Sequence, residues 1–425
     1  MDTVETWWPN GYGNQTLYDL TASFTSADIE DDISTKSVNI GFRTVELDQS
    51  FVDTDDPSSG RFYRIKVNNI YMFMRGSNWI PAHILPELVT PEYTRELLTA
   101  ARDTHQNCMR VWGGGIYETD EFYNIADELG ILMWQDMMFA CSMYPVDDNF
   151  LNTTLKETRL QAERLQHHPS VLLWSANNEN EAALKDNWYG TASNYDQYKE
   201  DYVKLYVDTI TTTLRSFDPS RNTIVSSPSN GLASEEAGYI ADDPYDARYG
   251  DVHYYNYDDN AWNYEQYPAT RFASEYGFQS FPSYQSLVPV FSAEDFSINS
   301  AMMSHRQHHP GGNTELGLQL KAHFVYDENT TSFTDYLYLC QLHQAMAIKT
   351  ETEFYRRMRS TLNADGTGYT MGSLYWQLND VWQGASWASI EFEDVGKYFR
   401  ITRELLQPLA TFLARRRKVE IDSCE

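Results

Sequence analysis

The chain has 425 residues, of which 42% are hydrophobic, and its formal net charge is −29. This hydrophobic content excludes global disorder, and the acidity excludes attraction of nucleic acid or an anionic membrane by a general positive field. No apolar run reaches the roughly 18 residues of a membrane-spanning helix. Aromatic residues make up 14% of the chain. They indicate either a Tyr-rich core or a carbohydrate site, because flat rings stack on sugar C–H faces.

The first part of the chain is predicted to form β-strands. Segments 17–24 and 37–47 alternate apolar and polar residues and contain β-branched side chains. Segments 62–67 and 70–74 flank Asn-Asn at 68–69, which is a hairpin signature. Two or three strands do not form an independent sandwich, so the first 48 residues either pack on the main domain or are the remnant of a larger one.

From about residue 70 the pattern changes to short strands that alternate with helices. Short apolar strands separated by helices indicate a parallel sheet, and eight of them fit a (β/α)8 barrel, known as a TIM barrel. No glycine-rich loop follows the first strand, which argues against a Rossmann fold. The expected strands are 70–76, 107–112, 131–136, 171–176, 223–226, 251–255, 271–275 and 371–377, and the expected helices include 91–104, 120–129, 149–167, 195–217 and 333–360.

These patterns divide the chain into three predicted parts. Residues 1–50 form a partial β-segment, residues 51–412 form the barrel with an insertion at about 300–360, and residues 413–425 form a polar tail. The first ten residues have neither the basic nor the apolar part of a signal peptide. Three glycosylation sequons are weak signs of a secretory route; they begin at Asn14, Asn152 and Asn329.

No cofactor and no metal site is predicted. The four cysteines are widely spaced and form no redox or metal motif, and the histidines of the segment 305–309 match no zinc spacing. That segment is better explained as a loop that lines a pocket. The residues concerned are Cys108, Cys141, Cys340, Cys424, His305, His308 and His309.

Polar and aromatic residues gather where the expected strands end. Glu179 follows the fourth strand, Glu275 ends the seventh, and Arg110 lies on the second. Each alone has a structural explanation, such as a helix cap, an ion pair or a core residue. Catalytic groups of a barrel come from the carboxyl ends of its strands. Two carboxylates across one barrel mouth are what glycoside hydrolysis requires.

Seven stretches of the chain resemble the β-mannosidases of glycoside hydrolase family 2, which belong to the clan of retaining glycosidases with catalytic Glu residues on strands four and seven. The stretches run through most of the chain in order: 7–18, 75–86, 109–145, 168–181, 272–280, 306–312 and 373–391. The resemblance implies a retaining exo-β-glycosidase that removes terminal non-reducing β-D-mannose from an oligosaccharide or glycoside. It also implies that residues 1–50 are the last strands of an immunoglobulin-like domain, and a lysosomal or secretory address.

The resemblance also assigns roles to single residues. Glu179 resembles the acid/base and Glu275 the nucleophile, while Arg110 and Tyr255 resemble the groups that keep the nucleophile ionised and in place. For Glu179 we expect a raised pKa, because it lies near that negative charge and is partly desolvated. The expected substrate-binding residues are Asn178, at the sugar 2-hydroxyl, Trp376, beneath the sugar ring, and His253, Asn78, Trp79, Trp112 and Asp380.

Other functions stay open at this point. Another family 2 glycosidase, such as a β-galactosidase, β-glucuronidase or exo-β-glucosaminidase, would use the same two carboxylates. A truncated, non-catalytic glycan-binding remnant would keep the aromatic residues without activity. A structural partner protein would use the barrel surface, but it leaves the rim residues unexplained. The preference for mannose follows from the resemblance alone.

Overall fold

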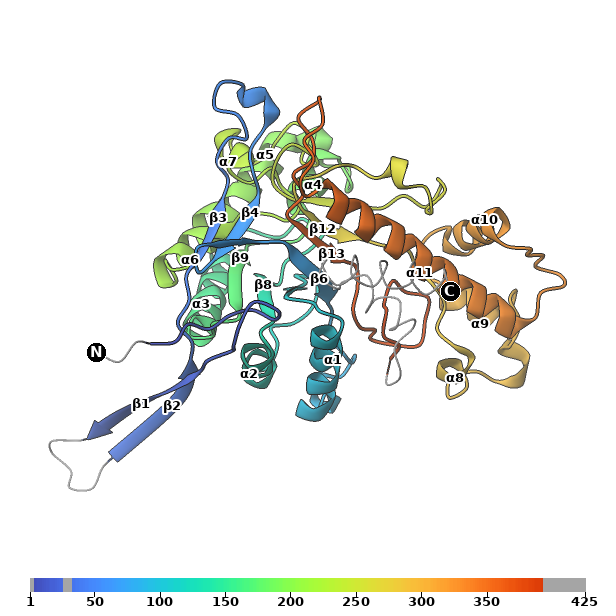
Figure 1. The fold of residues 1–425 in the computed structure, drawn as a ribbon, viewed down its shortest axis with the longest axis horizontal. Coiled ribbons are helices and arrows are strands. Elements are labelled where there is room, and N and C mark those ends of the chain that lie inside the picture. The colour runs from blue at the N-terminus through green and yellow to red at the C-terminus, as the bar shows by residue number, and fades with distance from the viewer. Residues whose placement is uncertain (1–3, 26–32, 393–425) are drawn as a thin grey trace, which may run out of the picture.

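The computed structural model describes residues 4–25 and 33–392, so the expected tail at 413–425 and the end of the expected barrel range lie outside the described residues. Eight parallel strands form one sheet in the order β10-β9-β8-β7-β6-β13-β12-β11. Because β6 pairs with both β7 and β13, the first and last strands are neighbours, as in a closed barrel (Figure 1). The predicted TIM barrel is therefore confirmed. Its strands are β6 Met74–Trp79, β7 Cys108–Val111, β8 Leu132–Asp136, β9 Val171–Ser175, β10 Thr223–Ile224, β11 Val252–Tyr254, β12 Ala273–Tyr276 and β13 Gly372–Tyr375.

The barrel closes between β10 and β11 through a single bridge rather than a strand ladder. The amide of Asp251 donates to the carbonyl of Ser229 at 3.0 Å. On its other side, β10 pairs with β9 through only two residues. This junction, which we call the β10–β11 seam, has a short backbone ladder, and the Asp251 carboxylate crosses it by accepting from the Ser227 hydroxyl and the Ser229 amide.

Two expected strands are each divided in the structure. The predicted strand 70–76 is wrong, because β5 Ile70–Met72 pairs back with β4 Arg64–Val67 and the barrel strand starts only at Met74. The predicted strand 37–47 is also wrong. It is split into β2 Ile33–Ile40 and β3 Val45–Asp48, which join different sheets. Gly41 lies at this break, where a Cβ would come within 2.8 Å of Pro169.

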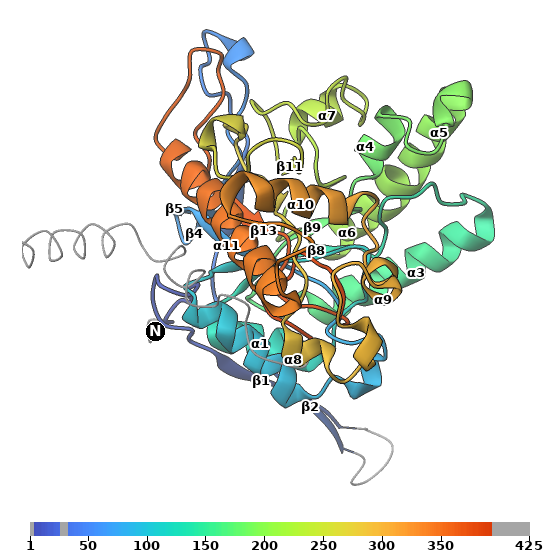
Figure 2. The ribbon, with the colours of Figure 1, turned by 90° about the vertical axis from the view of Figure 1, so that its right-hand side faces the viewer.

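Helices surround the barrel, and the first three begin at side-chain caps that the sequence provides. The side chains of Thr90, Thr119 and Asp147 accept amide hydrogen bonds at the first turns of the first three helices. The α-helices are α1 Pro91–Asp103, α2 Asp120–Leu129, α3 Asp148–Leu165, α4 Asn180–Lys185, α5 Tyr195–Tyr202, α6 Thr212–Phe217, α7 Leu232–Glu236, α8 Tyr284–Leu287, α9 Ala301–His305, α10 Gly312–His323 and α11 Phe333–Met358; a π-helical stretch, Val203–Thr211, joins α5 to α6. Short 3-10 turns occupy Pro57–Ser59, Pro86–Leu88, Thr191–Asn194, Tyr264–Gln266 and Ala293–Asp295. The segment between β12 and β13 carries α8 to α11, which lie together on one side of the barrel (Figure 2).

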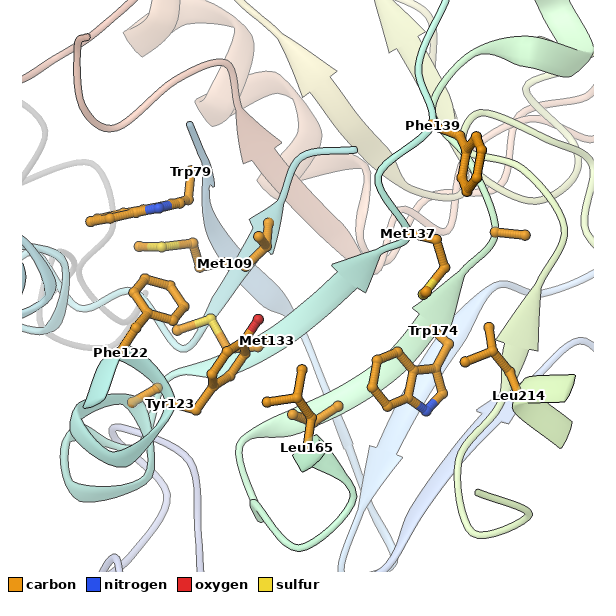
Figure 3. Packing of buried hydrophobic residues seen from close by; sticks show 14 of the residues in the cluster. Trp79, Met109, Phe122, Tyr123, Met133, Met137, Phe139, Leu165, Trp174 and Leu214 are labelled. Carbon is orange, nitrogen blue, oxygen red and sulfur yellow. The ribbon is translucent and has the colours of Figure 1, made fainter. Parts of the chain in front are cut away.

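The helices pack on the strands through a continuous apolar layer (Figure 3). Trp79 at the end of β6 lies against Phe122 of α2, with ring centroids 4.9 Å apart. Leu165 of α3 and Trp174 of β9 belong to the same buried cluster. This layer fixes the strand ends, and therefore the side chains that leave them at the barrel mouth.

A two-stranded hairpin projects away from the barrel (Figure 1). It consists of β1 Tyr18–Thr25 and β2 Ile33–Ile40, and most of its side chains are exposed. The chain on either side of it is anchored, because buried Trp7 donates its indole N–H to the carbonyl of Asp127 at 2.8 Å and Arg43 donates to the carbonyl of Pro169 at 2.9 Å. Among the helices of the described residues, none combines the length and apolarity needed to cross a membrane.

Candidate active site

The structure brings the two carboxylates expected at the ends of the fourth and seventh strands to one place. Glu179 lies in the turn between β9 and α4 with a left-handed backbone (φ 61°), and Glu275 lies on β12. One ligand atom each from Glu179, His253 and Glu275 lie within 4.8 Å of one another. An inverting glycosidase separates its carboxyl groups by about 6.5–9.5 Å to admit a water, and a retaining enzyme by about 5–5.5 Å. The observed spacing of the oxygen atoms is shorter than an inverting pair requires.

Arg110 holds Glu275 from inside the barrel. Its guanidinium is fully buried and donates from Nη1 to Glu275 Oε1, and from Nη2 to Asp136 Oδ2 at 2.7 Å and Asn178 Oδ1 at 2.6 Å. Burial alone would lower the pKa of Arg110, but the charges of Asp136 and Glu275 outweigh it and raise the pKa above its usual value. The cation is therefore permanent. For Asp136, burial outweighs Arg110 and raises the pKa to about 6.

Tyr255 and His253, from the β11 end, contact Glu275 on its other side. The Tyr255 hydroxyl donates to Glu275 Oε2 at 2.9 Å. His253 Nδ1 lies between the carboxylates, 2.9 Å from Glu179 Oε1 and 3.4 Å from Glu275 Oε2. Glu275 therefore has a donor on each oxygen, which fixes the orientation of its carboxyl group.

The hydrogen bonds of His253 favour its protonated form, the imidazolium. The Ser227 hydroxyl donates its proton to Asp251 Oδ2 at 2.6 Å, so it accepts from His253 Nε2 at 3.2 Å. With Nδ1 facing Glu179, both ring nitrogens are donors. Burial lowers the pKa of His253, but the charge of Glu275 and the hydrogen bond to Glu179 outweigh burial and raise it.

The pKa of Glu179 departs from the sequence prediction. Burial acts to raise it, but the hydrogen bond from His253 and the charge of that ring act against burial, and the pKa lies below its usual value. The prediction of a raised pKa is therefore wrong for the substrate-free protein. Its cause is His253, whose ring the sequence did not place beside Glu179. In the substrate-free protein the proton shared by this pair therefore favours the imidazole over Glu179.

Two indoles stand at the same rim. Trp112 directly follows β7 and Trp376 directly follows β13, and both are half-buried. Their ring centroids are 5.1 Å apart, edge to face. They provide apolar surface at the mouth on which a sugar ring can stack.

Three of the expected sugar contacts lie in the interior instead. Asn78 is fully buried and donates its amide to the carbonyl of Ser274 at 2.9 Å. Trp79 is 1% exposed and its indole donates to Glu118 at 2.8 Å. Asp380 is buried and accepts from the amide of Val381 at 2.9 Å. Asn78 still adjoins the site, because Arg110 Nη1 donates to its Oδ1 at 3.0 Å, whereas Trp79 packs away from the site against Phe122 of α2.

Several residues at the site were not singled out from the sequence. Asp136 forms an ion pair with Arg110, and Ser227 links Asp251 to His253. The thiol of Cys141 donates to Glu179 Oε2 at 3.0 Å. Asp136 ends β8, so the strand-end rule points to it. The contact of Cys141 joins two loops 38 residues apart and has no local sequence signal.

The acidic site also has the geometry to hold a cation. Glu179, His253 and Glu275 offer one atom each at ligand spacing. An imidazolium has no lone pair for a metal, however, and Arg110 already supplies positive charge to Glu275. The other histidines contact different partners: the rings of His308 and Trp382 lie 4.7 Å apart, and His309 Nε2 lies 3.0 Å from Glu315.

Comparison with known proteins places these residues in a family context. The family model described as "Glycosyl hydrolases family 2, TIM barrel domain" matches residues 113–297. The chain is 48% identical to a β-mannosidase of Capra hircus and 40% identical to a probable β-mannosidase of Caenorhabditis elegans, each over 92% of this chain and 44% of the relative. It thus spans less than half the length of the curated relatives it matches.

Solved structures agree with this likeness. The crystal structure of a β-D-mannosidase from Dictyoglomus thermophilum superposes with a TM-score of 0.82 at 32% identity, over 94% of this chain and 46% of that one. An exo-chitosanase from Amycolatopsis orientalis shares the fold at 20% identity, with a TM-score of 0.71 over 95% of this chain and 44% of that one.

Proposed function

Since the chain belongs to glycoside hydrolase family 2, we propose that it hydrolyses terminal, non-reducing β-D-mannose from β-mannosides with retention of configuration. The observation that carries the proposal is the pair Glu179 and Glu275, whose facing atoms lie within 4.8 Å of each other beside the buried Arg110. The choice of mannose is supported by the names of the relatives at 48% and 40% identity.

In the first step, Glu275 attacks the anomeric carbon. A bond forms between that carbon and a carboxylate oxygen while the bond to the leaving oxygen breaks, and Glu179 gives its proton to that oxygen. Arg110 and Tyr255 hold Glu275 ionised and oriented. Because Glu179 is ionised in the free protein, it takes its proton from His253, whose Nδ1 lies 2.9 Å away.

In the second step, water attacks the anomeric carbon from the face that the leaving group vacated. Glu179 accepts a proton from this water and returns it to His253, and the bond to Glu275 breaks, which restores both carboxylates and the protonated imidazole. Two inversions at one carbon give net retention. The proton given to the leaving group in the first step is thus replaced by the one taken from water in the second.

The half-buried indoles and Asn178 are the proposed sugar contacts. Trp376 and Trp112 offer stacking surface, and the Asn178 amide stands next to Glu179. We assign Asn178 to the sugar 2-hydroxyl, which is axial in mannose. We propose that Asn78 and Asp380 support the site through their hydrogen bonds to Arg110 and Ser386. Trp79 supports it by packing on α2.

We propose exo action, because the insertion reaches the mouth. His309 lies 4.9 Å from the ring of Tyr257, which is 6.2 Å from Tyr255. Internal cleavage of long mannan would contradict the exo assignment.

For the domains, we propose that residues 1–50 are the end of an immunoglobulin-like domain, residues 51–412 are the catalytic barrel and residues 413–425 are a tail.

The proposal is tested with a panel of nitrophenyl β-glycosides. We expect β-mannoside to be cleaved fastest, with the β-anomer of mannose released first in NMR spectra. A 2-fluoro mannosyl inactivator should label the peptide 272–280, which contains Glu275. Faster cleavage of β-galactoside, β-glucuronide or β-glucosaminide would assign the chain to another specificity of the family. Absence of cleavage with retained sugar binding would indicate a glycan-binding remnant.

A secretory or lysosomal address is part of the proposal. The side chains of Asn14, Asn152 and Asn329, which begin the three sequons, are exposed in the structure. Expression in a secretory host followed by endoglycosidase treatment tests it. A mass decrease is expected, and unchanged mass in a host that glycosylates a control protein would contradict it.

A further inference from the structure

The free thiol of Cys141 contacts the carboxylate that we assign as acid/base. Cys141 Sγ lies 3.0 Å from Glu179 Oε2, and the Asn178 amide donates to the same sulfur at 3.2 Å. We infer that Cys141 is a positioning residue of the reaction, which orients the Glu179 carboxyl group and adjusts how tightly it holds its proton. This inference rests on the proposed glycosidase function.

The backbone of Cys141 is built to hold the thiol in that place. Its φ of 47° is left-handed, a conformation that a residue with a Cβ rarely adopts. The Cys141 amide donates to the carbonyl of Asn178 at 3.0 Å, and the hydroxyl of Tyr189 donates to the Cys141 carbonyl. Ala140 and Asn178 form a parallel bridge just before. The loop that carries the thiol is therefore tied to the loop that carries Glu179.

Each oxygen of Glu179 has its own donor. Oε1 faces His253 Nδ1 at 2.9 Å, while Oε2 accepts from Cys141 at 3.0 Å and lies 3.4 Å from the Asn178 amide. Donors on both oxygens fix the plane of the carboxyl group. Preorganisation of this kind keeps a catalytic side chain at its productive geometry.

A thiol suits this place because it is a weak donor. It orients the carboxylate but stabilises the ionised form less than a hydroxyl would, so Glu179 can still take up the proton it must deliver. Serine at 141 should therefore make the site release its proton at lower pH, and alanine should make it hold the proton to higher pH. The titratable groups that face Glu179 from the surrounding elements are His253, Glu275, Arg110, Cys141, Tyr189 and Tyr245.

The first experiment compares Cys141→Ala and Cys141→Ser with Cys340→Ala, which removes a buried thiol of α11 far along the chain. The alkaline limb of kcat/KM reports the macroscopic pKa of the Glu179–His253 pair. We expect this limb to move up in pH for Cys141→Ala and down for Cys141→Ser, with Cys340→Ala unchanged. Unmoved limbs in both Cys141 variants, or shifts in the same direction, would overturn the inference.

Leaving groups provide the second readout. With a β-mannoside whose leaving group needs a proton, Cys141→Ala should lose about tenfold in kcat/KM, within the range of general acid effects. With dinitrophenolate, which leaves unprotonated, glycosylation should change less than about twofold. An equal loss with both substrates would show a general structural defect and would contradict a role through Glu179.

The contact itself can be tested without activity. The charge of Glu179 raises the pKa of the Cys141 thiol, in addition to a larger effect of burial. Because thiolate is the reactive form, Glu179→Gln should speed alkylation of Cys141 by iodoacetamide roughly tenfold, followed by mass spectrometry of its peptide. An unchanged rate would refute the contact. If alkylation responds but the wild-type protein cleaves no glycoside, the proposed function fails while the contact stands.

Discussion

At the residue scale, His253 decides how charge is distributed over the site. Its Nδ1 is shared by Glu179 and Glu275, and its Nε2 is held by Ser227. With Arg110, two cations face the two carboxylates of the proposed reaction. The arrangement orients Glu275 for attack and places a protonatable ring beside Glu179, where the leaving group needs a proton.

The two carboxylates should respond differently to substitution. Glu275→Gln should abolish formation of the glycosyl-enzyme with every substrate, because the attacking oxygen is lost. Glu179→Ala should still form it from dinitrophenyl β-mannoside, then release sugar slowly, about 10²–10⁴-fold below wild type where proton transfer matters. Added azide should restore turnover and give the β-glycosyl azide. Rescue of Glu275→Gln to the same β-azide product would reverse the two roles.

Glu181 should make stability depend on pH. Its Oε1 accepts from Ser234 and from the amide of Ala241, and burial raises its pKa to about 8. The folded protein keeps this proton up to about pH 8, whereas the unfolded chain loses it above roughly pH 4.3. This carboxyl therefore destabilises the fold increasingly as pH rises between these values.

The matching test is Glu181→Gln. Near pH 4.5 the free energies of unfolding of variant and wild type should be close, and by pH 8 the variant should be relatively more stable, on the order of 1 kcal/mol or more. Chemical denaturation at several pH values measures this. The exposed Glu200→Gln on α5 serves as control, and an equal pH trend in all three proteins would contradict the prediction.

The position of some single residues could be predicted from the sequence and that of others could not. Glu179 and Glu275 were predictable, because polar residues after buried parallel strands point to the barrel mouth. Trp79 was not, because an indole suits both a core and a sugar site, and strand alternation decides between them. On β6, Asn78 faces into the barrel toward Arg110, so Trp79 faces out toward Phe122 of α2.

At the scale of elements, the sequence was sufficient to place a helix where its capping residues are clear. The prediction 120–129 matches α2, whose cap at Thr119 and left-handed Gly130 mark both ends. The split of 37–47 was not predictable, because β-strand periodicity continues across Gly41 while the pairing partner changes from β1 to β4. Which strand pairs with which is a tertiary property.

Helix α3 offers a matched pair of leucines. Leu165 is fully buried in the apolar cluster (Figure 3). Leu160, on the same helix, is 56% exposed. Leu165→Ala should lower the free energy of unfolding by about 2–5 kcal/mol, through lost burial and a residual cavity. Leu160→Ala should change it by less than about 0.5 kcal/mol. Urea denaturation followed by tryptophan fluorescence compares them, and equal losses would contradict this packing.

At the scale of the whole molecule, the projecting hairpin leaves an apolar face in water. Leu20 and Phe24 lie on the same side of β1 and are 52% and 65% exposed. We expect the chain to bind a hydrophobic dye there. Leu20→Lys with Phe24→Lys should reduce that binding, whereas Thr21→Lys with Ser23→Lys on the opposite side should not. Equal dye binding in both pairs would place the apolar surface elsewhere.

The β10–β11 seam has a consequence for motion. Amide hydrogen exchange requires local opening, and opening is easiest where few hydrogen bonds must break together. The seam has a two-residue strand on one side and the Ser229–Asp251 bridge on the other. Ser227, which fixes His253, lies on the same stretch. Because the Ser227 hydroxyl joins Asp251 to His253, separating the two strands here would also release the imidazole, so the backbone pairing of the seam and the orientation of His253 depend on each other.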